Sequence, residues 1–186
     1  MMMQDIAMHI LDIGMNSIAA KSHHIQIALC QKENALWLQI HDDGCGMSEE
    51  TIKQVTDPFY TTRSTRSIGL GIPFLKAAAQ LCEGTFELSS KVQEGTSITA
   101  MFRLNHWDCP PLGDLGEAVV NLAVFDESIR FTLSYRNETD QFVFDTDRIK
   151  EELEGVALSE PSIMVWMKQF INEQISCLTK GGDGRL

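Results

Sequence analysis

The sequence predicts an α/β fold for about the first hundred residues, followed by a smaller α+β segment. One observation is that apolar residues recur at helical spacing over residues 4–20. Another is that apolar residues alternate with a period of two over residues 25–40 and 85–104, as they do in β-hairpins with one buried face. The third is a boundary at residues 105–113, where two prolines and a glycine interrupt the pattern.

The composition is that of a folded, acidic protein. A hydrophobic content of 44% in 186 residues supports a core, and a formal net charge of -11 argues against binding a nucleic-acid backbone or an anionic membrane. The start of the chain lacks a basic region, and no uncharged apolar stretch approaches the roughly 18 residues of a spanning helix. The five cysteines form no C-x-x-C pair, which favours reduced thiols. We therefore expect a cytoplasmic protein with no nucleic-acid or membrane partner.

The first predicted element is the helix over residues 4–20, in which four polar residues also fall at helical spacing and trace one stripe. A hairpin follows, with strands near residues 25–29 and 36–40. Ser48 and the two glutamates after it are typical of the start of a short helix.

The next stretch, residues 57–67, shows no periodicity. A helix over about residues 73–82 follows it, with a proline tolerated in the first turn. The second hairpin is expected from residues 85–90 and 96–104, and it closes the first predicted domain, residues 1–106.

The extension, residues 107–186, combines short helices and strands. Its acidic, partly helical character fits a docking or dimerisation surface, and a plain extension of the core, with Trp107 and Trp166 as core residues, fits equally. The expected elements are a helix near 114–125, a hairpin of 129–135 with 141–144, a short helix over 147–153 and a longer helix over 161–177.

Four motifs could carry chemistry, and the first is Asp12-x-x-x-Asn16. Residues at i and i+4 share a helix face, so the carboxylate and the amide point into the same space. An amide oxygen can ligate magnesium, and a nearby carboxylate can orient or deprotonate a nucleophile. The alternative is a solvent-facing polar stripe.

The second motif is Asp42-x-Gly44-x-Gly46-Met47, at the end of a predicted strand. A carboxylate there can accept a hydrogen bond from the exocyclic amine of adenine, and the glycines let a flat ring approach the backbone. The alternative is a common turn rich in Asp and Gly. Calcium is a poor fit, because the downstream glutamate of an EF-hand loop is missing.

The third motif is the polar segment from Asp57 onward, closed by Gly69-Leu70-Gly71 at a helix start, where unpaired amides and the helix dipole favour phosphate. A surface loop is the alternative. The fourth motif is Gly95-Thr96 at the start of the last strand of the first domain. The hydroxyls of the third motif and Arg63 or Arg66 could close over the triphosphate, and its candidate nucleotide-binding residues include Phe59, Thr61, Thr62 and Arg63.

In this order the motifs resemble the superfamily that unites sensor histidine kinases, type II topoisomerases, ninety-kilodalton heat-shock chaperones, mismatch-repair ATPases and anti-sigma serine kinases. The resemblance covers about Asp5 to Leu104. It implies a two-layer sandwich of a mixed β-sheet with helices on one face, the Bergerat ATP-binding fold. The chain contains no G-x-x-x-x-G-K-[ST] motif, so it is not a P-loop protein.

The resemblance also implies ATP and Mg2+ as ligands and assigns roles to several residues. Asn16 would bind magnesium, Asp42 would contact adenine with Gly46 beneath the ring, and Thr96 would approach adenine through water. Hydrolysing members and Ser/Thr kinases carry glutamate where this chain has Asp12, which makes Asp12 the candidate base, shorter by one methylene.

The leading functional expectation is an ATP-binding regulatory protein, either a slow ATPase or an anti-sigma-like Ser/Thr kinase, with an unidentified protein partner. Asn16 lies so near the start that we expect no phosphoacceptor helix ahead of it, and His9 is expected to be structural or at the surface. The alternatives are a non-catalytic, nucleotide-dependent binding switch, and the ATP-binding half of a split histidine kinase. The sequence leaves open whether the protein forms a homodimer.

Overall fold

A computed structural model describes residues 5–56 and 70–179. Its elements alternate between helices and hairpins in the order expected from the sequence. They are α1 (Ile6–Ala19), β1 (His24–Lys32), β2 (Ala35–Asp42), α2 (Glu49–Val55), α3 (Gly71–Leu81), β3 (Thr85–Lys91), β4 (Gly95–Arg103), α4 (Leu115–Phe125), β5 (Arg130–Arg136), β6 (Gln141–Asp145), α5 (Thr146–Glu152) and α6 (Pro161–Thr179).

The strands form one mixed sheet in the order β3-β4-β2-β1-β5-β6. All neighbouring pairs are antiparallel except β1 and β5, which are parallel. The period-two pattern places the apolar residues of the central strands in register, so that Ile27, Ile40 and Ile98 lie side by side and are buried. These rows of buried side chains form the sheet side of the hydrophobic core.

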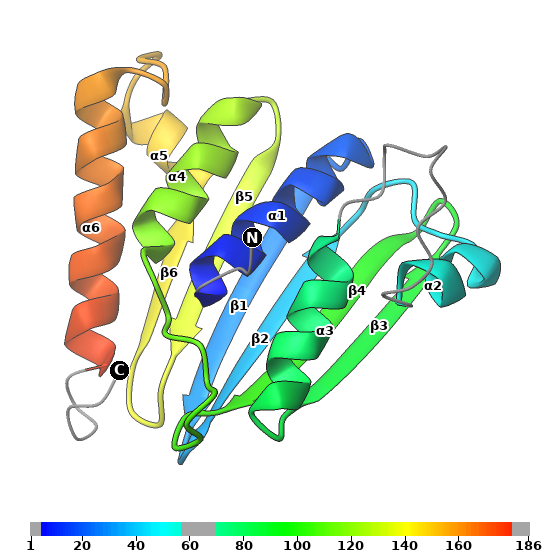
Figure 1. The fold of residues 1–186 in the computed structure, drawn as a ribbon. Helices are drawn as coiled ribbons and strands as arrows, with labels where there is room; N and C mark the ends of the chain where they lie inside the picture. Colours follow the sequence, from blue (N-terminus) through cyan, green and yellow to red (C-terminus); the bar gives the residue numbers. More distant parts are fainter. Residues whose placement is uncertain (1–4, 57–69, 180–186) are drawn as a thin grey trace.

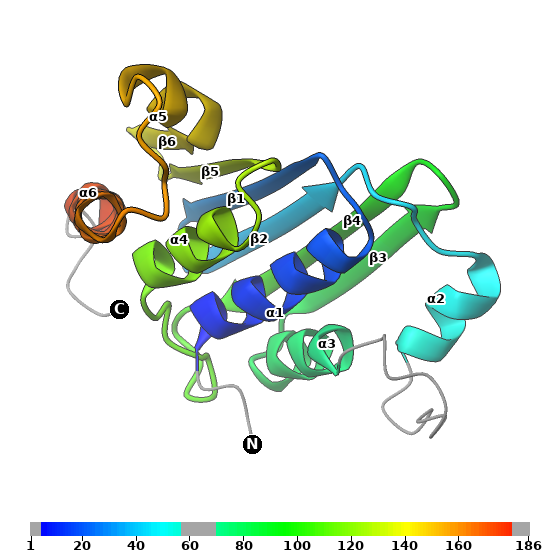
Figure 2. The same ribbon diagram turned by 90° about the horizontal axis from the view of Figure 1, so that it is seen from above.

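Helices α1, α3 and α4 cover one face of the sheet, as Figures 1 and 2 show. Helix α1 is capped by Asp5, whose carboxylate accepts a hydrogen bond from the Met8 N–H at 2.8 Å. The helix buries Ile6, Ile10 and Ile13. Helix α6 packs against α4 beside the β6 edge of the sheet. The predicted α/β sandwich of a mixed sheet and helices is therefore confirmed.

The segment after residue 106 continues this sheet. Strand β5 pairs with β1 along seven residues, from His24 opposite Arg130 to Cys30 opposite Arg136. The Tyr135 hydroxyl donates a hydrogen bond to the Gln31 side chain at 2.7 Å, and α4 packs against α1. The extension is thus joined to the first part by a ladder and by a helix contact.

Two expectations about single side chains differ from the structure. Trp107 is 99% exposed and Trp166 is 44% exposed, so neither is a core residue; Trp166 instead stacks on Phe170 with ring centroids 5.4 Å apart. His9, by contrast, is buried. Among the described residues, no helix combines the length and the apolar content that crossing a membrane requires.

Candidate functional site

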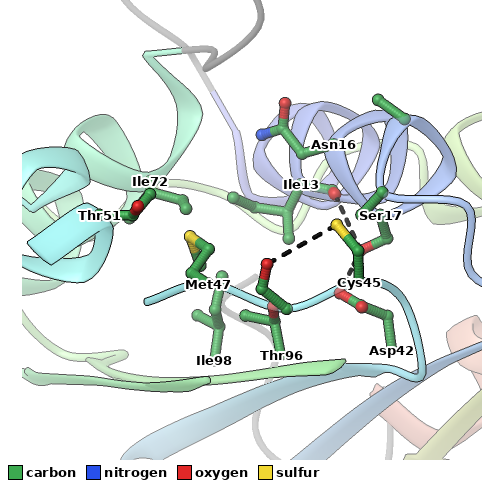
Figure 3. A pocket seen from close by; sticks show the side chains of 13 residues that line it. Ile13, Asn16, Ser17, Asp42, Cys45, Met47, Thr51, Ile72, Thr96 and Ile98 are labelled. Carbon is green, nitrogen blue, oxygen red and sulfur yellow. Dashed lines mark hydrogen bonds between the residues drawn. The ribbon is translucent and has the colours of Figure 1, made fainter. Parts of the chain in front are cut away.

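A cavity of about 250 Å³ opens between the C-terminal half of α1, the end of β2, the start of β4 and the first turn of α3. Figure 3 shows it from close by. Most of its walls are aliphatic, with a few polar groups among them. The lining residues are Ile13, Asn16, Ser17, Ala19, Ala20, Asp42, Cys45, Gly46, Met47, Thr51, Ile72, Thr96 and Ile98.

Asp42 is the buried carboxylate of this cavity, with 5% of its surface exposed. Its Oδ2 accepts a hydrogen bond from the Ser17 hydroxyl at 2.8 Å. Its Oδ1 accepts from the Ser22 hydroxyl at 3.2 Å and from the Gly44 N–H at 3.0 Å. Because each carboxylate oxygen can accept two hydrogen bonds, Oδ2 keeps one acceptor position for a further donor.

The turn after β2 is held close to two other elements. The Cys45 N–H donates to the Ala20 carbonyl at the end of α1 at 2.9 Å. Gly46 has a φ of +63°, and a Cβ at this position would lie 1.9 Å from the Lys91 carbonyl oxygen of the β3–β4 hairpin. Glycine is therefore required at residue 46 both by the backbone angle and by the close approach.

The opposite wall is built by the start of β4. The register of β2 with β4 places Thr96 directly across from Asp42. The Ser90 hydroxyl lies 3.0 Å from the Thr96 hydroxyl and accepts a hydrogen bond from the Met47 N–H at 2.8 Å. The ladder and this hydroxyl contact bring the second and fourth motifs predicted from the sequence to one cavity.

Asn16 and Asp12 lie on α1 at the α3 side of the site. Asn16 is half-buried, and Figure 3 shows its amide projecting from α1 on the side away from Asp42. The Asp12 carboxylate lies against the backbone of Gly71, where an added Cβ would come 1.8 Å from Asp12 Oδ2. Partial burial raises the pKa of Asp12 above its ordinary value.

The remaining predicted site residues divide into two groups. Leu70 is exposed and Gly71 is buried, at the first turn of α3. The third-motif residues Phe59, Thr61, Thr62, Arg63 and Gly69 lie outside the described residues.

Sequence reasoning missed Ser17 and Ser22, which orient Asp42. The available signal was that Ser17 is a polar residue on the apolar face of α1, four residues after Ile13. It also missed the aliphatic walls from Ile72 and Ile98, which look like ordinary core residues in a linear pattern. Within residues 5–56 and 70–179, no group of three or more His, Cys, Asp or Glu side chains could hold a metal ion.

The sequence of this chain was compared with known proteins, and a family model matches its first part. Residues 2–106 match the family described as histidine kinase-, DNA gyrase B-, and HSP90-like ATPase. Sensor histidine kinase YvrG of Bacillus subtilis is 37% identical over 87 residues, which cover 45% of this chain and 15% of that protein. Sensor histidine kinase YxdK of the same organism is 32% identical over 88 residues, 45% of this chain and 27% of that protein.

A solved structure of the N-terminal domain of a DNA repair protein has a similar fold, with a TM-score of 0.54 at 12% identity. The likeness covers 76% of this chain and 52% of that one, and it therefore extends beyond the residues that match the family. The matches span only 15% and 27% of the two kinases. A putative sensor protein of Shewanella frigidimarina is 28% identical over 107 residues, which cover 57% of this chain and 16% of that protein.

Proposed function

The chain belongs to the histidine kinase-, DNA gyrase B-, and HSP90-like ATPase family, an ATP-binding family, and on that premise we propose that it transfers the γ-phosphoryl group of ATP. The acceptor would be water or a Ser/Thr hydroxyl of a protein partner, which makes the protein a slow ATPase or an anti-sigma-like kinase. The observation that carries the proposal is the buried Asp42 carboxylate in a mostly aliphatic cavity. Three hydrogen-bond donors fix its orientation, and its Oδ2 can still accept one further hydrogen bond.

The cavity fits the base of the nucleotide. A flat heteroaromatic ring needs apolar contacts on its faces and a few fixed polar groups at its edge. The apolar contacts would come from Ile13, Met47 and Ile98. The Oδ2 atom of Asp42 would accept a hydrogen bond from an exocyclic amine. Guanine would present a carbonyl oxygen at the equivalent position, which cannot donate a hydrogen bond to Asp42 Oδ2, so the site favours adenine.

The phosphates would extend from the cavity toward α3. Asn16 would hold Mg2+ through its amide oxygen, together with phosphate oxygens, and the bound ion would neutralise charge on the triphosphate. Leu70, at the N-cap of α3, makes no side-chain cap, so among the described residues the amides of Gly71 and Ile72 would be the donors to an anion.

Asp12 would act as the general base. Its carboxylate lies against Gly71 at the start of α3, on the same side of α1 as Asn16. It would accept the proton of the attacking water or hydroxyl while the new O–P bond forms, and ADP would leave with the electrons of the broken bond. Its raised pKa brings it closer to neutral pH, where a general base is most effective.

A second candidate function is supported by the relatives. The matching region of YvrG belongs to a sensor histidine kinase, and this chain would then serve as the ATP-binding half that phosphorylates a His-bearing partner. A third candidate is a non-catalytic switch, in which ATP only alters the surface that a partner binds. Both use the same cavity. The split histidine kinase differs from the leading proposal in the acceptor, and the switch transfers no phosphoryl group.

The first experiment is calorimetry of ATP with magnesium on the native protein, Asp42→Asn and Asp108→Asn, with phosphate release followed in the same samples. Asp42→Asn replaces an acceptor oxygen with a donor, so ATP binding should weaken at least about 10-fold. Asp108 is exposed and follows the far end of β4, so Asp108→Asn controls for the loss of one charge. No native binding at millimolar ATP would refute the nucleotide site.

The enzyme and the switch are separated by Asp12→Asn. We expect this variant to bind ATP as the native protein does and to release phosphate at least about 100-fold more slowly. Native protein that binds ATP but shows no turnover, alone or with a copurified partner, would support the switch. Labelled phosphate that is stable in alkali and lost in acid on a partner would support the split histidine kinase.

A further inference from the structure

His9 is the buried histidine of α1. It is 1% exposed, and neither Nδ1 nor Nε2 has a hydrogen-bond partner among the described residues. Burial lowers the pKa of His9, although the nearby charge of Asp5 opposes this effect, so the imidazole is neutral at pH 7. A neutral imidazole carries one N–H donor and one acceptor nitrogen, and both are unused here.

Packing does not explain this residue. A buried polar group without a partner destabilises the folded state, and an aliphatic side chain of similar volume would fill the same space without that cost. The neighbouring buried positions of the helix, Ile6, Ile10 and Ile13, are all aliphatic. A buried polar side chain without hydrogen-bond partners therefore indicates a role other than packing.

The position of His9 on the helix relates it to Asp12. Residues at i and i+3 are neighbours on a helix surface, with about 5–6 Å between their Cβ atoms. The Asp12 carboxylate lies against Gly71 and, within the described residues, accepts no hydrogen bond and forms no ion pair. A donor without an acceptor therefore stands one turn from a carboxylate without a donor.

We propose that His9 is the positioning residue of Asp12. When Asp12 is ionised and ATP is bound, a side-chain rotation brings the His9 N–H to the carboxylate and fixes its orientation toward the nucleophile. This arrangement repeats a general pattern, in which a catalytic base is oriented by a third group. It also compensates for the short reach of aspartate. The proposal rests on the proposed function, because it assigns Asp12 as the base.

The carboxylate whose charge acts on His9 in this structure is that of Asp5, which already caps α1, and the titratable groups on α3 and α4 are paired elsewhere. On α3, the Lys76 ammonium lies 3.4 Å from the Thr56 carbonyl, and the Cys82 thiol donates to the Ala79 carbonyl. On α4, Glu117 is paired with Lys168. On α1 itself, Asp5 caps the helix through the Met8 N–H, which leaves Asp12 as the carboxylate without a partner.

The test uses the full chain and measures the steady-state rate of phosphate release, KM for ATP and the melting temperature. The variants are His9→Leu, His9→Asn and His9→Gln, the last two supplying an amide N–H near the position of either ring nitrogen. His23→Leu makes the same change at an exposed histidine and serves as the control.

We expect His9→Leu to melt at the native temperature or higher and to lower kcat roughly 10- to 100-fold, as loss of an orienting partner does, with KM for ATP within about twofold of native. At least one amide variant should recover most of kcat, and His23→Leu should behave as native. A purely structural histidine would move the melting temperature and leave kcat in place.

Three results would overturn the inference. They are native kcat in His9→Leu, a loss of kcat that tracks a loss of stability in every variant, and a loss that neither amide restores. The failure of the proposed function gives a different pattern, since native protein would then bind ATP without turnover before any substitution is made. Turnover in the native protein that His9→Leu leaves unchanged refutes the positioning role alone.

Discussion

Two aspartates beside the cavity have pKa values that shift in opposite directions. Burial raises the pKa of Asp12 above 3.8. Burial also acts on Asp43, but hydrogen bonds from the His24 and His23 N–H groups outweigh it and lower the pKa of Asp43. The two carboxylates therefore contribute to folding stability with opposite dependence on pH.

We predict that Asp12→Asn raises the free energy of unfolding at pH 7 relative to native, and that this difference narrows as the pH falls toward 3.8. The folded state holds the Asp12 proton more tightly than the unfolded chain does. Its stabilising contribution is therefore complete below the unfolded pKa and is lost as pH rises through the folded pKa. Urea unfolding at a series of pH values measures the difference.

Asp43→Asn provides the matched comparison with the opposite sign. Folding stabilises the ionised form of the Asp43 carboxylate, so the substitution should lower the free energy of unfolding at pH 7. This loss of free energy should become smaller as the pH falls through the pKa of Asp43 in the folded state. The interpretation of Asp12 would be wrong if both substitutions shifted stability in the same direction at pH 7.

At the residue scale, the sequence predicted the polar members of the site and missed the groups that orient them. Asp42, Gly46 and Thr96 could be found because their spacing is specific to a strand-end motif and a strand start. Ser17 and Ser22 could not, because a serine near a helix end is common, and only the fold shows that both hydroxyls converge on one carboxylate.

The turn after β2 and the β3–β4 hairpin behave as one packed unit. Gly46 has a left-handed φ and touches the Lys91 carbonyl, and the Met47 N–H bonds to Ser90 of the same hairpin. The Asp42 side of the cavity therefore depends on how closely two loops approach each other. A change that separates them should affect stability and binding together.

We predict that Gly46→Ala lowers the free energy of unfolding by at least about 2 kcal/mol and abolishes measurable ATP binding, because backbone strain and a backbone clash add. Gly155→Ala is the control. Gly155 also has a positive φ, +99°, but a Cβ there would meet nothing within 4 Å, so only the backbone strain applies. Equal losses in the two variants would contradict the close approach at residue 46.

At the element scale, nearly every helix and strand was predictable, because the spacing of its apolar residues indicates its type and its capping or turn residues mark its ends. Helix α3 begins two residues earlier than the sequence indicated, at Gly71 rather than Pro73, since proline is compatible with the first turn and does not mark the first residue. Helix α1 was also predicted. His9 was expected to be structural or at the surface, and the structure shows it buried. A polar residue on a polar stripe gives no sign of which of the two applies.

In the whole molecule, α4 and α1 join the extension to the first part of the chain. The Leu122 side chain of α4 is fully buried and lies against Gly14 of α1, where an added Cβ would come 2.5 Å from Leu122 Cδ1. Together with the β1–β5 ladder, this contact should make residues before and after 106 unfold together.

We predict one calorimetric transition for the full chain, with equal calorimetric and van't Hoff enthalpies. Leu122→Ala should shift the whole transition downward, with a loss of about 2–5 kcal/mol in stability from the cavity it creates. Val165→Ala changes an exposed aliphatic residue of α6 and should leave the transition in place. Two separate transitions, of which Leu122→Ala moves one, would show that the extension folds independently.

The arrangement of the strands was the part of the fold that sequence patterns left open. Alternation shows that residues 129–135 form a strand with one buried face, but it does not identify the neighbour of that strand. The pairing of β5 with β1 depends on the α4 crossover, because a parallel neighbour requires a long connection rather than a tight turn. That information lies in packing between residues far apart in the chain.

The same pairing sets an order of events during synthesis. Strand β1 is complete once Lys32 has left the ribosome, but its β5 partner ends only at Arg136. Until then one side of β1 is an unpaired edge with apolar side chains beside it, which is the kind of surface that attracts other nascent chains. A growing chain of this protein is thus most prone to aggregate through the very strand that becomes interior in the finished molecule.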